Sequence, residues 1–177
     1  MSQARQLVSQ HGPKVWRTLC RLLGSDHLAD VEDCFQEVFV AALELGRKDE
    51  VRNWEAMLCR IASRKGLDLL RTRIRQRARH NGETDLETVP AQGSFVSEAL
   101  EQAELAADLR QALARLPLQE AELFCLRHLE EMNYAQIGAE LNMTAGAVGV
   151  ALHRIREKLR NWLGGEMAGQ PNEVRHE

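Results

Sequence analysis

Apolar residues recur at helical spacing along most of the chain, and the pattern is clearest towards its C-terminal end. One stripe there consists of Val148, Leu152, Ile155, Leu159 and Trp162, at intervals of 4, 3, 4 and 3 residues. A shorter stripe before it consists of Tyr134, Ile137 and Leu141. Such intervals place side chains on one face of an α-helix. The pattern therefore predicts a short helix and then a longer one, divided at residues 142–144.

The dividing segment has the features of a tight turn. Thr144 stands where an N-cap belongs, because its hydroxyl can accept a hydrogen bond from an amide of the first helical turn. Gly138 has no side chain to obstruct a close crossing of the two helices. Two helices joined in this way are typical of a helix-turn-helix. Basic residues off the apolar stripe of the second helix favour DNA binding, and a helical hairpin with a solvated basic face is the alternative.

The same spacing predicts five further helices. Their expected ranges are Gln3–Leu23, His27–Leu45, Val51–Arg79, Glu98–Leu116 and Leu118–Leu129. We expect Leu45 and Leu105 among the core positions of the second and fourth of these helices. No alternating run of Val, Ile and Thr predicts a strand.

An acidic segment with glycine and proline interrupts the helical pattern at residues 81–95. This composition is typical of an interdomain linker. We therefore predict an all-α fold of two small helical domains joined by a flexible linker, with the helix-turn-helix in the C-terminal domain. The expected domains are residues 1–80 and 96–163, followed by a flexible tail at 164–177.

The charges are unevenly distributed, although the formal net charge is only −3. Residues 60–80 contain eight Lys or Arg against Asp68 alone, whereas residues 81–131 contain eleven Asp or Glu against three Arg. Local patches decide whether a phosphate backbone is attracted. The run RTRIRQRAR spreads arginines around the helix, which favours contact with nucleic acid over a merely solvated helix end. The acidic face of the second helix is compatible with plain solubility.

Other chemistry finds little support. The chain contains no GxxxxGK[ST], GxGxxG, HExxH or GxSxG motif, so we expect neither an enzyme nor a cofactor. Its four cysteines are far apart and lack zinc spacing, which predicts buried free thiols and no metal site. The sequence shows no signal peptide and no apolar run of the roughly 18 residues that a membrane span needs. We therefore expect a cytoplasmic protein without membrane insertion.

Three stretches, taken together and in order, resemble the extracytoplasmic-function (ECF) sigma factors of bacterial RNA polymerase. They are ADVEDCFQEVFVAAL in the second helix, MLCRIASRKGLDLLRTRIR in the third, and LARLPLQEAELFCLRHLEEMNYAQIGAELNMTAGAVGVALHRIREKL at the C-terminal side. The last is the most specific, because it has the family's Leu-Pro, Tyr-x-x-Ile, turn, Gly-x-Val and Arg-rich end in the expected order. The likeness covers roughly residues 10–163.

The resemblance implies three functional surfaces. The second helix would dock on the clamp-helix coiled coil of the largest subunit of core RNA polymerase, through Asp33, Gln36 and Glu37. The turn at residues 47–53 and the start of the third helix would hold the unpaired non-template strand of the −10 promoter element. The candidate phosphate contacts there are Arg60, Arg64, Lys65, Arg71 and Arg73. The helix beginning at Ala145 would enter the major groove of the −35 element. Its candidate DNA-binding residues are Thr144, Ala145, Ala147, Val150, His153 and Arg154.

The chain departs from the family pattern in ways that alter these expectations. Met57 takes the usual Trp position, and Trp54, one turn earlier, is a candidate to fill the same core space. Arg64 stands where Asn is common. The start of the recognition helix is rich in Gly and Ala, which permits methyl contacts to thymine but little bidentate base readout. We therefore expect −35 recognition to depend on His153, Arg154, phosphate contacts and DNA shape.

The function that follows is that of a sigma factor, which binds core polymerase, directs it to promoters and assists melting. A stand-alone helix-turn-helix regulator is the alternative, although a regulator needs neither the acidic second helix nor the arginine-rich third. A helical interaction module without nucleic acid is a third possibility, and the basic run at residues 60–80 argues against it. The expected partners are core RNA polymerase and promoter DNA, and the resemblance adds an anti-sigma factor as a further candidate.

Overall fold

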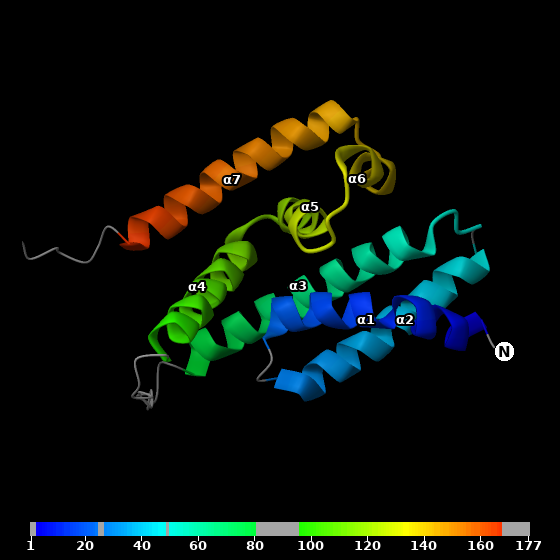
Figure 1. The fold of residues 1–177 in the computed structure, drawn as a ribbon, viewed down its shortest axis with the longest axis horizontal. Coiled ribbons are helices and arrows are strands. Elements are labelled where there is room, and N and C mark those ends of the chain that lie inside the picture. The colour runs from blue at the N-terminus through cyan, green and yellow to red at the C-terminus, as the bar shows by residue number, and fades with distance from the viewer. Residues whose placement is uncertain (1–2, 25–26, 49, 81–95, 168–177) are drawn as a thin grey trace, which may run out of the picture.

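The computed structural model of the chain describes residues 3–24, 27–48, 50–80 and 96–167. Within these ranges it contains α-helices and no strand, so the expected all-α fold is confirmed (Figure 1). The helices are α1 (Gln3–Leu23), α2 (Leu28–Lys48), α3 (Trp54–His80), α4 (Val96–Arg115), α5 (Leu118–His128), α6 (Tyr134–Leu141) and α7 (Ala145–Met167). The predicted linker at 81–95 lies outside the described residues.

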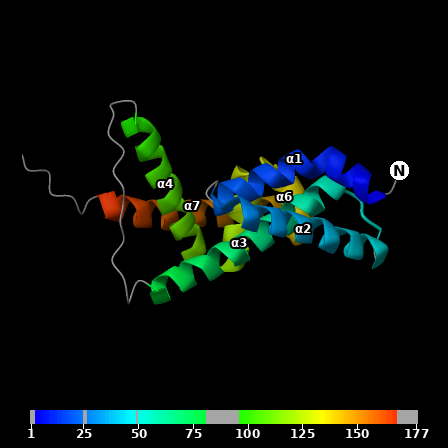
Figure 2. The same cartoon turned by 90° about the horizontal axis from the view of Figure 1, so that it is seen from below.

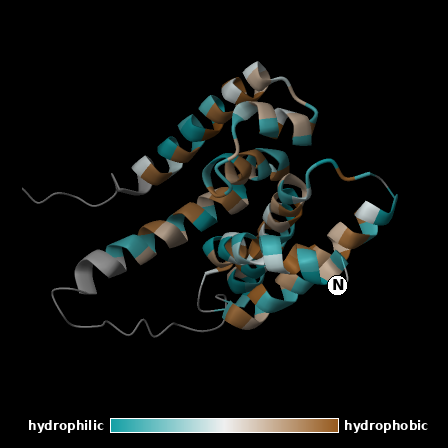
Figure 3. Ribbon diagram, turned by 45° about the vertical axis from the view of Figure 1, so that its right-hand side comes forward, coloured by the Kyte–Doolittle hydropathy of each residue, from teal (hydrophilic) through white to brown (hydrophobic). Residues whose placement is uncertain are grey.

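The N-terminal group of helices is built on apolar stripes that meet. Helix α1 packs against both α2 and α3, and α2 packs against α3. Leu19, Leu58 and Leu67 are completely buried where these helices meet. Burial of one such leucine contributes roughly 1.5–3 kcal/mol, so the stripes provide much of the energy that holds the group together. Figure 3 shows hydrophobic residues gathered on the sides of the helices that face one another.

The C-terminal group contains the predicted helix-turn-helix. Helix α6 begins with a capping box between Asn133 and Gln136, and its C-cap is Asn142, which adopts the left-handed conformation (φ 54°). Thr144 caps α7 as expected, since its Oγ1 accepts a hydrogen bond from the Ala147 amide at 3.2 Å. The apolar stripe of α7 is buried against α4, α5 and α6.

The two groups of helices pack directly against each other, which the sequence did not predict. Helix α3 contacts α4, α5 and α6, and Figure 2 shows α3 running beneath the helices of the C-terminal group. The buried residues of both groups form one hydrophobic cluster. Helix α7 lies on the opposite side of the C-terminal group from α3, far from α2 (Figure 1). The chain therefore combines two helical units into a single packed body.

Several expected details differ. Leu45 and Leu105 are exposed, at 44% and 58%, instead of belonging to the core. Helix α3 begins at Trp54 and not at Val51, because Asn53 Oδ1 accepts a hydrogen bond from the Ala56 amide at 3.0 Å and so caps the helix. Helix α7 continues to Met167, into the segment expected to be a tail. The rest of that tail, residues 168–177, lies outside the described residues.

Candidate polymerase and nucleic-acid interfaces

The acidic face of α2 is exposed and hollowed. Asp33, Gln36 and Glu37 point away from the core and line a surface depression together with Val40 and Lys65. Val40 is 56% exposed, so an apolar side chain stands among acidic ones. Lys65 Nζ lies 2.8 Å from Glu37 Oε2 and neutralises part of the charge. An exposed patch that mixes acids with an aliphatic residue can accept a basic, partly apolar partner.

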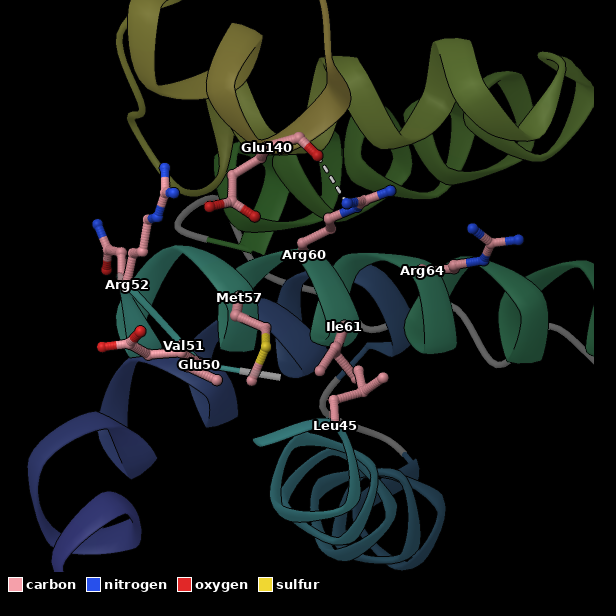
Figure 4. Close-up of a pocket in the computed structure, with 10 residues that line it drawn as sticks. Leu45, Glu50, Val51, Arg52, Met57, Arg60, Ile61, Arg64 and Glu140 are labelled. Carbon is pink, nitrogen blue, oxygen red and sulfur yellow. Dashed lines mark hydrogen bonds between the residues drawn. The ribbon is translucent and has the colours of Figure 1, made fainter. Parts of the chain in front are cut away.

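A second hollow lies between the end of α2, the loop at residues 50–53 and the start of α3. It has a volume of about 460 Å³, which is within the range of small-ligand sites. Met57, Ile61 and Leu45 form its apolar wall, and Arg60 and Arg64 stand along one rim (Figure 4). Leu45 is exposed because it lines this hollow and not the core.

The C-terminal group also contributes to the rim on which Arg60 stands. Glu140 of α6 lies above the hollow, and its backbone oxygen accepts a 2.6 Å hydrogen bond from Arg60 Nη1 (Figure 4). Burial raises the pKa of the Glu140 carboxyl, and Arg60 partly opposes that effect. Glu140, eighty residues further along the chain than Arg60, thus lines the same hollow as the loop at residues 50–53.

Trp54 packs against α2, whereas Met57 lines the hollow. A Cβ on Gly46 would fall less than 3.0 Å from the Trp54 ring, so the absence of a side chain at Gly46 lets the ring pack closely against α2. Met57, at the usual Trp position, is half-buried and lines the hollow. The helix contact and the hollow therefore belong to two different side chains here.

The five predicted phosphate contacts of α3 have different environments. Arg60 and Arg71 donate to the C-terminal group of helices, Arg71 through a 2.6 Å hydrogen bond from Nη2 to the Leu116 oxygen. Arg73 pairs with Asp30 and also donates to the Leu23 oxygen at 3.1 Å. These three cations have protein partners in this conformation.

Lys65 and Arg64 complete the predicted set. Lys65 pairs with Glu37, as described above. Arg64 is exposed and makes no hydrogen bond or ion pair with another residue in the described ranges. Of the five predicted contacts, Arg64 is thus the one whose side chain has no partner in the described residues.

The outer face of α7 is open. Ala145, Ala147, His153 and Arg154 are exposed, and Val150 is 55% exposed. The exposed Thr144 hydroxyl accepts the hydrogen bond that caps the helix, and its predicted contact with DNA stays a prediction. The face offers methyl groups first and cationic side chains about two turns later, as the sequence suggested.

Two buried carboxylates were not anticipated. Glu122 and Glu130 are each only 3% exposed. Glu122 Oε1 accepts from Arg60 Nε at 3.1 Å, and Glu130 accepts from the Thr18 hydroxyl, so both join the two groups of helices. The register of α5 gave a signal, because Glu122 lies four residues after Leu118 and four before Leu126, on the apolar stripe.

The remaining candidate chemistry is limited. The four cysteines are free thiols, of which three are buried and Cys20 is half-buried. Burial raises the pKa of the Cys34 thiol to about 11 and raises the pKa of the other three as well. The described residues contain no cluster of His, Cys, Asp and Glu suited to a metal ion. None of the described helices is long and apolar enough to span a bilayer.

Both groups of helices match known protein families. Residues 7–76 match the family "Sigma-70 region 2", and residues 106–159 match "Sigma-70, region 4". The ECF RNA polymerase sigma factor ShbA of Streptomyces griseus is 37% identical over 137 residues, which cover 73% of this chain and 70% of ShbA. The chain belongs to the ECF sigma factors. The expected resemblance is thereby confirmed, and the alternative of a stand-alone regulator is not favoured.

Two further ECF sigma factors are similar to this chain over most of its length. The ECF sigma factor SigE of Mycolicibacterium smegmatis is 34% identical over 158 residues, covering 89% of this chain but only 60% of SigE. SigW of Bacillus subtilis is 28% identical over 164 residues, covering 89% of this chain and 87% of SigW. The fold resembles the sigma factor RpoE of Bartonella quintana, solved in complex with the anti-sigma factor NepR, with a TM-score of 0.52 and 20% identity. That likeness covers 90% of this chain and 96% of RpoE and concerns the fold alone.

Proposed function

We propose that this sigma factor binds bacterial core RNA polymerase, directs it to specific promoters and assists promoter melting. The observation that carries the proposal is the presence of region 2 and region 4 in order in one chain. The protein itself catalyses no reaction and acts in the cytoplasm, where transcription takes place.

The exposed acidic face of α2 supports polymerase docking. Asp33 has no hydrogen-bond partner in the described residues and is free to meet a cationic partner. Asp33→Lys should weaken binding to core polymerase about tenfold or more, because it places like charges together in the interface. Glu32→Lys is the matched control, since Glu32 is also exposed but lies about 100° around the helix. Equal effects of the two substitutions would show that only overall charge matters and would remove Asp33 from the docking surface.

The hollow beside the 50–53 loop supports capture of an unpaired base from the −10 element. Its apolar wall can stack against a base, and Arg64 can hold a neighbouring phosphate. Arg60, Lys65, Arg71 and Arg73 become available for phosphates when their protein partners move away.

The open face of α7 supports contact with the −35 element. Arg154→Ala should cost about 1–3 kcal/mol of promoter binding. Unchanged promoter footprints at physiological salt would rule out Arg154 as a DNA contact. Arg160→Ala is a suitable control, because Arg160 pairs with Glu157 within the helix.

Run-off transcription with purified core polymerase and a candidate promoter tests the proposed function as a whole. Transcripts that require both the polymerase and this chain are the expected result. DNA binding without polymerase-dependent transcripts would instead favour a stand-alone regulator. An anti-sigma factor is a further proposed partner, supported by the fold shared with RpoE, which was solved with one.

A further inference from the structure

Three arginines of the N-terminal group donate to helix C-termini of the C-terminal group. The contacts run from Arg21 to the Leu129 oxygen (3.2 Å), from Arg60 to the Glu140 oxygen (2.6 Å) and from Arg71 to the Leu116 oxygen (2.6 Å). Leu129 is the C-cap of α5, Glu140 lies in the last turn of α6, and Leu116 directly follows α4. At the C-terminal end of each of these three helices, a carbonyl oxygen therefore accepts a hydrogen bond from a guanidinium group.

Helix C-termini resemble phosphate groups in the features that arginine recognises. The unpaired carbonyls of the last turn carry a partial charge of about −0.5 and offer several acceptor oxygens. Arg60 and Arg71 are also two of the proposed −10 phosphate contacts. In this conformation the protein's own backbone occupies donors that the DNA backbone would use.

Carboxylates reinforce these contacts. Buried Glu122 pairs with Arg60, and buried Glu130 accepts from Thr18 of α1. Glu140 adds its carboxyl to the rim of the hollow beside the 50–53 loop (Figure 4). Arg60 is therefore held by a carboxylate as well as by a backbone oxygen.

We propose that region 4 acts as an internal phosphate mimic that closes the −10 site of the free sigma factor. The inference rests on the proposed function and adds a regulatory step to it. The docking face of α2 and the outer face of α7 stay exposed in this closed state, whereas Arg60 and Arg71 of the single-strand site are engaged by region 4. Polymerase can therefore bind the closed form, and separation of the two regions must follow before the unpaired strand is held.

The chain has enough length for that separation. Residues 81–95 join His80 to Val96 and could span up to about 50 Å if fully extended. Opening therefore requires no change within either group of helices. It breaks the contacts of α3 with α4, α5 and α6 and frees Arg60 and Arg71.

Glu122→Arg tests the closure, because it places a cation against Arg60 in a buried site. The readouts on the full free chain are the radius of gyration by small-angle X-ray scattering and the affinity for a fluorescent mixed-sequence single strand of about 12 nucleotides. If the open state is a minor one of at most about 10%, opening should raise the affinity about tenfold or more. Glu104→Arg makes the same charge change on exposed α4 and should leave both readouts close to the wild type.

A second variant guards against misfolding of Glu122→Arg. Arg21→Ala/Arg110→Ala removes the hydrogen bond to Leu129 and the 3.2 Å bond from Arg110 to the Arg21 oxygen. Both side chains lie outside the proposed DNA contacts. The variant loses two positive charges, so tighter binding of the strand could come only from opening.

Two results would overturn the closure. One is a wild-type chain that is already extended in solution, and the other is an expanded Glu122→Arg chain that binds the strand no better than Glu104→Arg does. Run-off transcription by the wild type is scored separately. Its failure would reject the proposed function, whereas active transcription with either of these two results would reject the closure alone.

Discussion

The turn of the helix-turn-helix leaves no room for a side chain at Gly138, and Gly138→Ala should therefore destabilise the protein. A Cβ there would fall less than 3.0 Å from the Met143 carbonyl oxygen and 3.4 Å from its carbonyl carbon. Ordinary contact begins at 3.4 Å, so the methyl group would overlap the oxygen by more than 0.4 Å. The overlapping atom belongs to the backbone and cannot rotate away as a side chain would. The Met143 amide also donates a 2.9 Å hydrogen bond to the Gly138 oxygen, which fixes this part of the turn.

Two opposing terms set the magnitude. Replacing glycine by alanine within a helix gains up to about 1 kcal/mol. Forcing an extra methyl group into a packed site costs about 1–3 kcal/mol. The backbone of this turn can shift little to relieve the overlap, because Asn142 holds it in the left-handed conformation. The upper end of that cost applies, which leaves a net loss of about 2 kcal/mol. In a protein of this size, such a loss lowers Tm by roughly 4–8 °C.

Thermal unfolding followed by circular dichroism measures the effect, with Gly146→Ala as the control. Nothing lies within 4 Å of a Cβ at Gly146, so that variant should be as stable as the wild type or up to about 1 kcal/mol more stable. The two substitutions are the same chemically and lie in the same motif. If Gly138→Ala proved as stable as Gly146→Ala, the steric reasoning would be refuted.

Three further predictions concern local chemistry. Thr144→Ala should cost about 1 kcal/mol in chemical denaturation through loss of the α7 cap, whereas Thr144→Ser should retain it. Burial, with Arg156 and Arg127 nearby, lowers the pKa of His128, so the unfolded chain binds more protons than the folded one as the pH falls. Stability should fall from about pH 7.5 to about pH 5.5, and less in His128→Gln; equal slopes would exclude His128 as the cause. Half-buried Cys20 should react with a thiol reagent before the three buried cysteines do, as peptide mapping would show.

Much of the fold could be predicted because helical periodicity reports directly on burial. The predicted apolar stripe of α7 is confirmed, since Val148 and Leu152 are completely buried and Ile155 is nearly so. The turn was equally readable, because Thr144 and the left-handed Asn142 are residue types that favour those positions. These features depend on local sequence alone.

Long-range packing could not be read in the same way. Periodicity shows that a face is buried but not which element covers it, so Leu45 was taken as core when it lines a surface hollow. The contact between the two regions rests on arginine donors and backbone acceptors, and backbone acceptors carry no sequence signature. Glu122 interrupts an apolar stripe and was a hint that a cation from elsewhere in the chain would pair with it.

The closure and the composition of the recognition helix fit together on physical grounds. The exposed start of α7 offers Ala145, Ala147 and Val150, which read few base edges. If few bases of the −35 element are read, the free chain binds promoter DNA only slightly better than non-specific DNA. A basic α3 with all its cations free would further strengthen binding to any phosphate backbone. Engaging Arg60 and Arg71 with helix C-termini removes part of that attraction from the free chain. Opening linked to polymerase would restore it only where region 4 and the polymerase already hold the promoter, so both regions then act on the same DNA at high effective concentration.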